Sequence, residues 1–373
     1  MTYRSFNPKE KILMGPGPSN VDPRVLGAMS RPILGHLDPD FVGLMDEIKV
    51  LLRYAFQTEN ALTFPVSAPG SAGMETCFVN LIEPGDKVVV CINGVFGTRM
   101  KENVERCGGE VIVVEDKWGH PVDLDKVESA LLSNKDAKIL AFVHAETSTG
   151  VCSDAAGLAK LAMQNNCLTI MDCVTSLGGI PVLLDEWGID AAYSGSQKCL
   201  SCSPGLSPVS FSQKAVEAII NRSTKVQSWF LDLSLVMNYW SDGGKRSYHH
   251  TAPINAMYGL HESLILLKAE GLEKAWGRHQ SMHEKLRDGL EALGFKYLVD
   301  EKYRLPQLNS VIIPDHLKAS EATIRQSLLN NHDLEIGSGL GALAGDIWRI
   351  GLMGYGASDS NVAKCLKAFA DEF

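Results

Sequence analysis

The fold is decided by the stretch KILAFVHAETSTGVCSDAAGLAKLAMQNNCLTIMDCV, residues 138–174. Its two outer runs, 138–145 and 168–174, are nearly continuous in apolar residues, as strands buried on both faces are. The segment between them, 154–166, has its apolar residues at helical spacing. A strand, a helix and a second strand in this order predict a βαβ unit with parallel strands.

The same alternation extends over residues 60–215. Further apolar runs, separated by amphipathic segments, lie at 61–67, 86–93, 110–115 and 190–196. Strands that alternate with helices predict a large α/β domain with a mostly parallel sheet and helices on both faces.

The pattern changes after about Thr251, where a long helical stretch with a break at Gly271 leads into shorter strands and helices. This part is typical of a smaller α+β domain. We therefore expect an N-terminal arm without regular structure over residues 1–20, a large domain over 21–268 and a small C-terminal domain over 269–373.

Composition narrows the possible functions. The 373 residues exceed what one hydrophobic core usually organises, which agrees with two domains. The net charge of −9 argues against nucleic acid or an anionic membrane surface as the main partner. No apolar run approaches the roughly 18 residues that a membrane-spanning helix needs. The nine cysteines show no framework spacing and the start of the chain has no targeting pattern, so we expect a cytoplasmic protein with reduced thiols.

Candidate functional residues follow the predicted strands, because an open parallel sheet binds ligands at the carboxyl ends of its strands. The run 61–67 ends in APGSAGMETC, a glycine-flanked turn that opens a helix. Such a helix N-terminus suits a phosphate, and Ser71 adds a hydroxyl, although an ordinary turn explains the pattern equally well.

Asp172 lies inside an apolar run, where a carboxylate needs a cationic or hydrogen-bonding partner. It either caps a helix or joins a structural ion pair, or it keeps a heteroaromatic nitrogen protonated.

Lys198 follows the run 190–196. A partly desolvated lysine has a lowered pKa and forms a Schiff base with carbonyls, whereas most lysines are solvated. Together, a phosphate turn, a buried acid and a lysine at one sheet edge match what pyridoxal phosphate needs.

Cys199 and Cys202 form a Cys-x-x-Cys directly after this lysine and raise two competing interpretations. A redox pair opens a helix in a thioredoxin-like unit, which is not the context here. A zinc site needs two more ligands, and the sequence has no second pair. We therefore predict no metal site and treat both cysteines as packing residues.

The motifs in order are ILMGPGPSNVDPRVL, ETSTG, DCVTSLGG, YSGSQK, YHHT and RIGLMG, and they extend over nearly the whole chain. With this order and spacing the sequence resembles the class V aminotransferases, of fold type I among the pyridoxal-phosphate-dependent enzymes. Within them it resembles the alanine–glyoxylate and serine–pyruvate branch. The resemblance implies a large, mostly parallel-sheet domain and a smaller α+β domain.

The resemblance also implies how the cofactor is bound. Lys198 would carry the cofactor covalently and move a proton between Cα and C4′, and Asp172 would pair with the ring nitrogen. Val174 and Phe96 would pack on the two faces of the cofactor ring, and the best-known relatives carry Trp at the Phe96 position. Thr147 would lie near the phenolic oxygen of the cofactor. The phosphate would be bound by Gly70, Ser71, Ala72 and Gln197 of the same subunit and by Tyr248 and Thr251 of the neighbouring subunit.

On the substrate side the resemblance implies that Arg349 binds the carboxylate, with Gly17 close by. The implied activity is ping-pong transamination in a homodimer that shares its active sites across the interface. Alanine or serine would be the donor and glyoxylate or pyruvate the acceptor.

Three alternatives remain at this point. Ureidoglycine–glyoxylate aminotransferases have similar sequences. A cysteine desulfurase needs a nucleophilic cysteine on a loop near the substrate arginine, and residues 300–348 contain none; Gln197 also stands where those enzymes tend to carry histidine. A cofactor-free interaction protein is disfavoured by the intact set of Asp172, Lys198 and Arg349.

Overall fold

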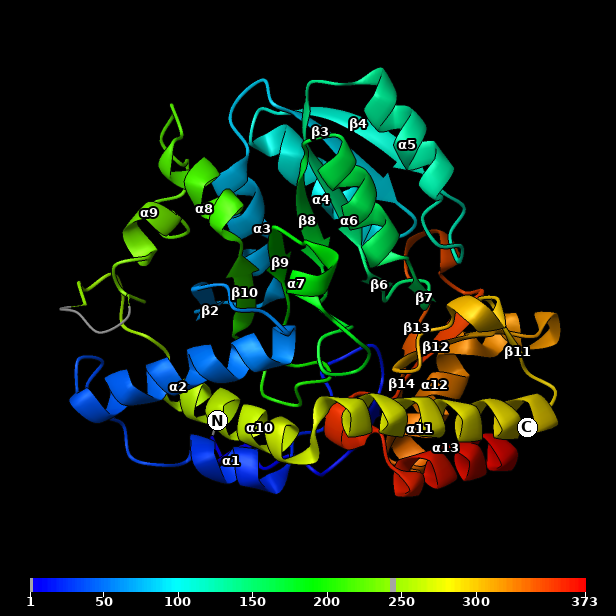
Figure 1. Cartoon of the computed structure of the whole chain (residues 1–373). Helices are drawn as coiled ribbons and strands as arrows, with labels where there is room; N and C mark the ends of the chain where they lie inside the picture. The colour runs from blue at the N-terminus through cyan, green and yellow to red at the C-terminus, as the bar shows by residue number, and fades with distance from the viewer. Residues whose placement is uncertain (1–2, 242–245) are drawn as a thin grey trace.

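The computed structural model describes residues 3–241 and 246–373. Its larger part is built on a seven-stranded sheet with the strand order β2-β10-β9-β8-β5-β3-β4 (Figure 1). These strands are β2 (Leu62–Val66), β3 (Lys87–Ile92), β4 (Glu110–Glu115), β5 (Ala137–Val143), β8 (Leu168–Asp172), β9 (Ala191–Tyr193) and β10 (Ser207–Phe211).

Most of this sheet is parallel, as predicted. Residues 138–174 fold into β5, α6 and β8, and the two strands pair in parallel with Val143 opposite Asp172. Strands β3, β4 and β9 continue the parallel run. The exception is β10, which pairs antiparallel with both β9 and β2. Its sequence SPVSF is short and contains a proline, so it was not among the predicted strands.

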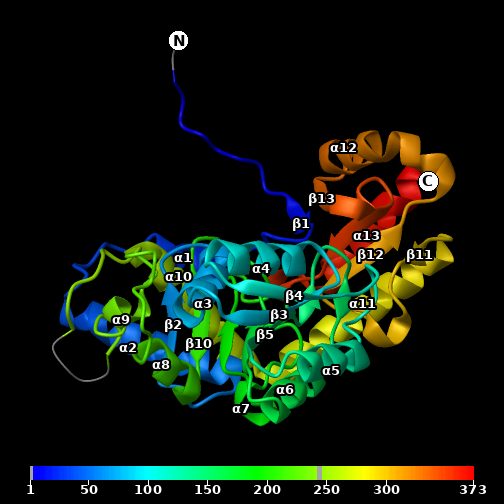
Figure 2. The ribbon, with the colours of Figure 1, turned by 90° about the horizontal axis from the view of Figure 1, so that it is seen from above.

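Helices cover both faces of the large sheet (Figure 2). One face carries α3 (Gly70–Leu81) and α4 (Val95–Arg106), and the other carries α5 (Leu124–Ser133), α6 (Ala155–Gln164) and α7 (Leu184–Trp187). At the β2 end lie α8 (Gln213–Ile220) and α9 (Leu233–Val236). Helix α10 (Ile254–Glu270) packs against both α1 (Pro23–Met29) and α2 (Pro39–Phe56). A short hairpin, β6 (Ala145–Glu146) and β7 (Val151–Cys152), follows β5.

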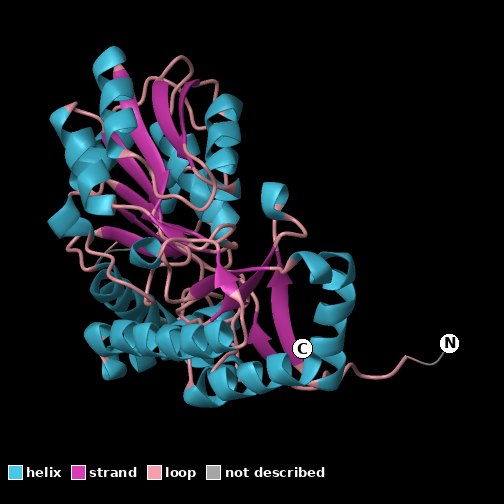
Figure 3. Ribbon diagram, turned by 90° about the vertical axis from the view of Figure 1, so that its right-hand side faces the viewer, coloured by secondary structure: helices cyan, strands magenta, loops and turns pink. Residues whose placement is uncertain are grey.

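The smaller part is a five-stranded sheet beside the C-terminal helices (Figure 3). Its strands, in spatial order, are β1 (Ile12–Met14), β13 (Leu334–Ser338), β14 (Ile347–Gly351), β12 (Leu308–Ile312) and β11 (Lys296–Tyr297). Its helices are α11 (Leu272–Ala292), α12 (Glu321–Asn331) and α13 (Asp359–Glu372).

The N-terminal arm differs from its prediction. Residues 12–14 form β1, which pairs in parallel with β13, so the expectation that the first twenty residues contain no regular structure is wrong at this point. Three apolar residues are too few to reveal a strand locally; the free edge of β13, far away in sequence, provides the pairing. The described residues before β1 extend away from the body of the molecule (Figure 2).

Gly271 separates the two long helices, as predicted. It adopts a φ of +87°, which favours glycine, and its N–H donates to Leu267 O at 2.9 Å. The hydrophobic core also changes over near this kink. One cluster contains buried residues from 25 to 275, and a second contains Met14 and residues from 282 to 369.

Two further observations concern residues 3–241 and 246–373 only. None of the helices there combines the length and apolar character needed to cross a membrane. The same residues contain no cluster of three or more His, Cys, Asp or Glu side chains arranged to hold a metal ion.

The hydrophobic core of the small domain allows a prediction about how much a truncated side chain lowers the free energy of unfolding. Phe369 on α13 is fully buried, with its ring 5.5 Å from Phe295 and 5.8 Å from Trp348 between centroids. We expect Phe369→Ala to lower the free energy of unfolding by about 3–5 kcal/mol, because it removes apolar burial and leaves a cavity. Chemical denaturation followed by circular dichroism measures this.

Leu293→Ala is the control, because Leu293 lies at the end of α11 with 41% of its surface exposed. A change within about 0.5 kcal/mol is expected there. Equal losses in the two variants would contradict the assignment of the small core.

Candidate active site

A cavity of about 210 Å³ lies at the carboxyl ends of β8 and β9. Most of the predicted cofactor-binding residues line it, together with residues that the sequence did not single out. The predicted residues on its wall are Gly70, Ser71, Phe96, Thr147, Asp172, Val174, Gln197 and Lys198. The additional ones are Pro69, Met74, Arg99, Ala145, Thr175 and Tyr193.

The turn after β2 brings the N-terminus of α3 to this cavity. Pro69 is the N-cap and makes no side-chain cap, so the first N–H groups of the helix, at Gly70 and Ser71, have no intrahelical partner. Ala72 differs from its prediction: it is not part of the wall, and its N–H is turned back to Pro69 O at 2.8 Å. The turn can hold an anion through Gly70 and Ser71.

Asp172 is the last residue of β8, and its carboxylate is almost completely buried. It accepts hydrogen bonds from Val174 N and from the Tyr193 hydroxyl, both at 2.8 Å. Burial raises the pKa of Asp172 to about 7, and these two hydrogen bonds oppose the rise. The carboxyl therefore binds a proton far more readily than an exposed aspartate does.

Lys198 is half-buried beside this acid, and both residues line the cavity. Burial lowers the pKa of its amine to about 8, and the positive charge of Arg349 adds to this effect. Its Nζ donates to the carbonyl of Pro16. Gly17 has a φ of +105°, and a Cβ at this position would lie 2.5 Å from Lys198 Nζ. The arm therefore leaves room for the amine only because residue 17 is glycine.

Arg349, on β14, approaches the cavity from the small domain. It is buried and does not form part of the 210 Å³ wall. Its Nε donates to Ser338 O at 2.7 Å and its Nη1 to Thr147 O at 3.2 Å, and Thr147 does line the cavity. Burial lowers the pKa of Arg349, while the carboxylate of Glu146 opposes this.

Glu146 is a buried carboxylate that the sequence reasoning did not select. It accepts hydrogen bonds from Ser148 N at 3.0 Å, Ser148 Oγ at 2.6 Å and Phe96 N at 3.2 Å. It thereby caps α4 and fixes the helix turn that carries Phe96, whose ring has the Arg99 guanidinium 4.9 Å from its centroid. Glu146 directly follows the apolar run 138–145, so the expectation that functional residues follow the predicted strands applies to it as well.

Tyr248 and Thr251 lie away from this cavity. Both are exposed, and their hydroxyls are 3.4 Å apart. Cys199 and Cys202 are buried free thiols. The Cys199 Sγ donates to Thr175 O at 3.4 Å, so each cysteine packs into the protein and the two do not pair.

Comparison with known proteins shows the family to which the chain belongs. The family model "Aminotransferase class-V" matches residues 25–343. The chain belongs to the class V aminotransferase family. Similar proteins include the alanine–glyoxylate aminotransferase of Oryctolagus cuniculus, which is 41% identical over 97% of this chain and 92% of its own length. The (S)-ureidoglycine–glyoxylate transaminase of Bacillus subtilis is 36% identical over 94% of this chain and 88% of its own length.

Solved structures of class V aminotransferases superpose closely on the chain. The alanine–glyoxylate aminotransferase of Nostoc sp. has a TM-score of 0.97 at 45% identity and covers all of this chain and 97% of its own. The ureidoglycine–glyoxylate aminotransferase of Bacillus subtilis has a TM-score of 0.96 at 36% identity, over 99% of this chain and 94% of its own. The fold type I architecture expected from the sequence is therefore confirmed.

The raised pKa of Asp172 makes a testable prediction about this aminotransferase. The pKa is 3.8 for an ordinary aspartate and about 7 in the folded protein. Between these values the native state binds the additional proton, so rising pH lowers the stability. In ligand-free protein, Asp172→Asn should match the wild type near pH 4 and be roughly 2–4 kcal/mol more stable near pH 8. Urea denaturation at the two pH values measures this.

Asp136→Asn is the control, because the exposed Asp136 pairs with Lys87 and its pKa is lowered by that contact. This variant should gain no stability at pH 8. If Asp172→Asn behaves in the same way, Asp172 is not a strained buried acid.

Proposed function

We propose that this aminotransferase uses pyridoxal phosphate to transfer the amino group of alanine or serine to glyoxylate or pyruvate in a ping-pong cycle. The observation that carries the proposal is the meeting of a half-buried amine, Lys198, a buried acid, Asp172, and an uncapped helix N-terminus on one cavity. The names of the similar proteins support the choice of glyoxylate as acceptor.

The residues present fit the cofactor. Gln197 Oε1 is buried on the cavity without a hydrogen-bond partner among the described residues, beside the helix N-terminus at Gly70 and Ser71. The donors in this turn, the backbone N–H groups of Gly70 and Ser71 and the side-chain Nε2 of Gln197, would hold the phosphate, and Val174 and Phe96 would contact the ring. When bound, pyridoxal phosphate supplies an aldehyde for covalent attachment and an electron-withdrawing ring. The attachment point is the Lys198 Nζ.

Asp172 holds the proton on the ring nitrogen in this proposal. An ionised carboxylate in a dry site stabilises a nearby cation strongly, because little solvent screens the two charges. The Tyr193 hydroxyl and the Val174 N–H bind the carboxylate and keep one orientation. Without this acid the ring nitrogen would lose its proton to water at neutral pH.

Lys198 moves the substrate proton. With a pKa of about 8, the amine exchanges a proton near neutral pH, as a general base and acid must. With the cofactor bound, the free Nζ would take the Cα proton of the substrate and would be the group that returns it. The closeness of Gly17 and Pro16 keeps this amine away from bulk water.

Arg349 orients the substrate by its carboxylate. The guanidinium has five N–H donors, and the hydrogen bonds to Ser338 O and Thr147 O use two of them. The remaining donors can bind a carboxylate in a bidentate way. Because every amino acid and 2-oxo acid in the cycle has a carboxylate, one arginine serves both half-reactions.

We also infer a homodimer in which Tyr248 and Thr251 reach the phosphate of the partner's cavity. Their exposure, and the fact that they do not line the cavity of their own chain, support this inference. The cytoplasmic location stays a prediction from the composition.

Ureidoglycine is the second candidate donor, favoured by the Bacillus subtilis relative. Single half-reactions distinguish the donors: holoenzyme is mixed with alanine, serine or ureidoglycine, and the formation of pyridoxamine phosphate is followed by absorbance. We expect alanine or serine to react fastest. A much faster reaction with ureidoglycine would replace the proposed donor, and no reaction with any of the three would end the proposal.

Lys198→Ala is the control for these assays and should abolish turnover. Borohydride should fix the cofactor on the wild-type peptide that contains residue 198 and not on this variant. Lys160→Ala, at an exposed position on α6, should behave like the wild type. Appreciable alanine–glyoxylate activity in Lys198→Ala would contradict the role of the amine.

Arg349 generates a kinetic prediction. Arg349→Ala should weaken the binding of all carboxylate substrates together by roughly 2–4 kcal/mol, about 30- to 700-fold in KM. Steady-state kinetics with two donors and two acceptors measure this. Arg325→Ala, which removes the pair with Glu321 on α12, is the control. A rise in KM for only one substrate would show that Arg349 contacts a side chain and not the shared carboxylate.

A further inference from the structure

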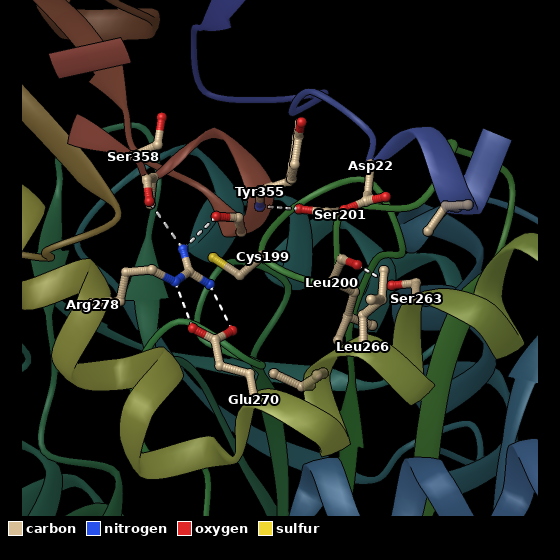
Figure 4. Close-up of a pocket in the computed structure, with 14 residues that line it drawn as sticks. Asp22, Cys199, Leu200, Ser201, Ser263, Leu266, Glu270, Arg278, Tyr355 and Ser358 are labelled. Carbon is tan, nitrogen blue, oxygen red and sulfur yellow. Dashed lines mark hydrogen bonds and ion pairs between the residues drawn. The ribbon is translucent and has the colours of Figure 1, made fainter. Parts of the chain in front are cut away.

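A second cavity, of about 380 Å³, lies at the seam between the two domains (Figure 4). The turn 199–201, which directly follows Lys198, forms one wall. Helices α1, α10 and α11 and the loop 354–358 of the small domain form the others. Cys199 and Met353 belong to one small apolar cluster. Leu200 packs into the large hydrophobic core, and on the side of the cavity hydrogen bonds join the turn to the loop.

The turn and the loop meet at Ser201. Ser201 has a φ of +53°, a left-handed conformation that is unfavourable for serine. In this conformation its N–H donates to Lys198 O at 2.9 Å, and its Oγ accepts from Tyr355 N at 2.7 Å (Figure 4). A Cβ on Gly354 would lie 2.6 Å from Cys199 O, so the two segments are in direct backbone contact.

Arg278 holds the loop from the other side. Its Nη1 donates to Gly354 O at 2.7 Å and Ala357 O at 3.1 Å, and the guanidinium also makes two hydrogen bonds to Glu270, at 2.6 and 2.9 Å (Figure 4). The pair with Glu270 spans the kink at Gly271. These contacts lower the pKa of Glu270, which keeps the carboxylate charged.

His279, the next residue on α11, completes the attachment. Its Nε2 accepts from Gly354 N at 2.9 Å, while its Nδ1 lies 2.6 Å from Ala275 O, which fixes the tautomer with the proton on Nδ1. Burial lowers the pKa of His279 to about 4, so the ring stays a neutral acceptor at physiological pH. The loop is thus bound to α11 through both the N–H and the carbonyl oxygen of Gly354.

The loop 354–358 follows β14, the strand that carries Arg349. We propose that Arg278 and Ser201 are positioning residues that set the spacing between the Lys198 amine and the Arg349 guanidinium, by locking the loop 354–358 to the turn that follows the lysine. The use of this spacing, which is to place the substrate Cα beside the amine, rests on the proposed function. The spacing itself is a property of the folded chain.

The titration of Lys198 reports this spacing without any substrate. Both burial and the charge of Arg349 lower the pKa of Lys198. If the loop separates from the turn, water enters and the two cations move apart, and both changes raise that pKa. In cofactor-free protein, the rate of reductive methylation at Lys198 is measured against pH by peptide mass spectrometry with formaldehyde and cyanoborohydride.

Two variants weaken the contacts between the loop 354–358 and the turn 199–201 in different ways. Arg278→Lys keeps the positive charge and loses the planar fork that binds two carbonyls and Glu270 together. Ser201→Gly removes the hydroxyl and relieves the left-handed strain, so it should fold at least as well as the wild type. We expect the methylation midpoint to rise by roughly 0.5–1 pH unit in each. Arg287→Lys is the control on the same helix, because Arg287 pairs with the exposed acids Asp288 and Glu301, and no shift is expected.

Kinetics of the holoenzyme give the second readout. Both variants should lose turnover more than substrate affinity, because Arg349 still binds the carboxylate while Lys198 is displaced from Cα. Unchanged midpoints in both folded variants would overturn the proposal. A shifted midpoint together with failure of every half-reaction would still support the role of the contacts between the loop 354–358 and the turn 199–201. It would overturn only the proposed function.

Discussion

Burial in one cavity shifts the pKa of a carboxylate and the pKa of an amine in opposite directions, each toward its neutral form. Burial moves the pKa of Asp172 up to about 7 and that of Lys198 down to about 8. The two groups therefore titrate close to each other and to neutral pH, which is the condition for proton exchange at a reaction centre. The parallel sheet brings the two groups together, because β8, which carries Asp172, and β9, which precedes Lys198, end at the same edge.

The cost of these buried charges is offset by neighbours that are themselves buried. Tyr193 and the N–H of Val174 satisfy Asp172, and Glu146 satisfies the N-terminal turn of α4. The negative charge of Glu146 opposes the lowering of the Arg349 pKa and adds to the rise of the Asp172 pKa. The acid that fixes the helix turn of Phe96 thus also shifts the pKa values of Asp172 and Arg349.

Local sequence information predicted the large sheet and the residues at its strand ends, since periodicity and an acid within an apolar run are visible in a short window. It did not reveal β10 or β1, whose pairing partners lie far away in the chain. It also missed Tyr193, because a tyrosine at a strand end has no distinctive local pattern until its hydroxyl is seen on Asp172. Ala72 was selected by its place in a motif, whereas the turn points its N–H back to Pro69.

The spacing between amine and guanidinium belongs to neither domain alone. Lys198 lies on a turn of the large domain and Arg349 on a strand of the small one, so their separation depends on contacts at the seam. Packing is incomplete there, and a few directional hydrogen bonds at Ser201, Arg278 and His279 take its place. Hydrogen bonds fix distance and orientation more narrowly than apolar contact does. A seam of this kind can be loosened by one side chain without loss of either core.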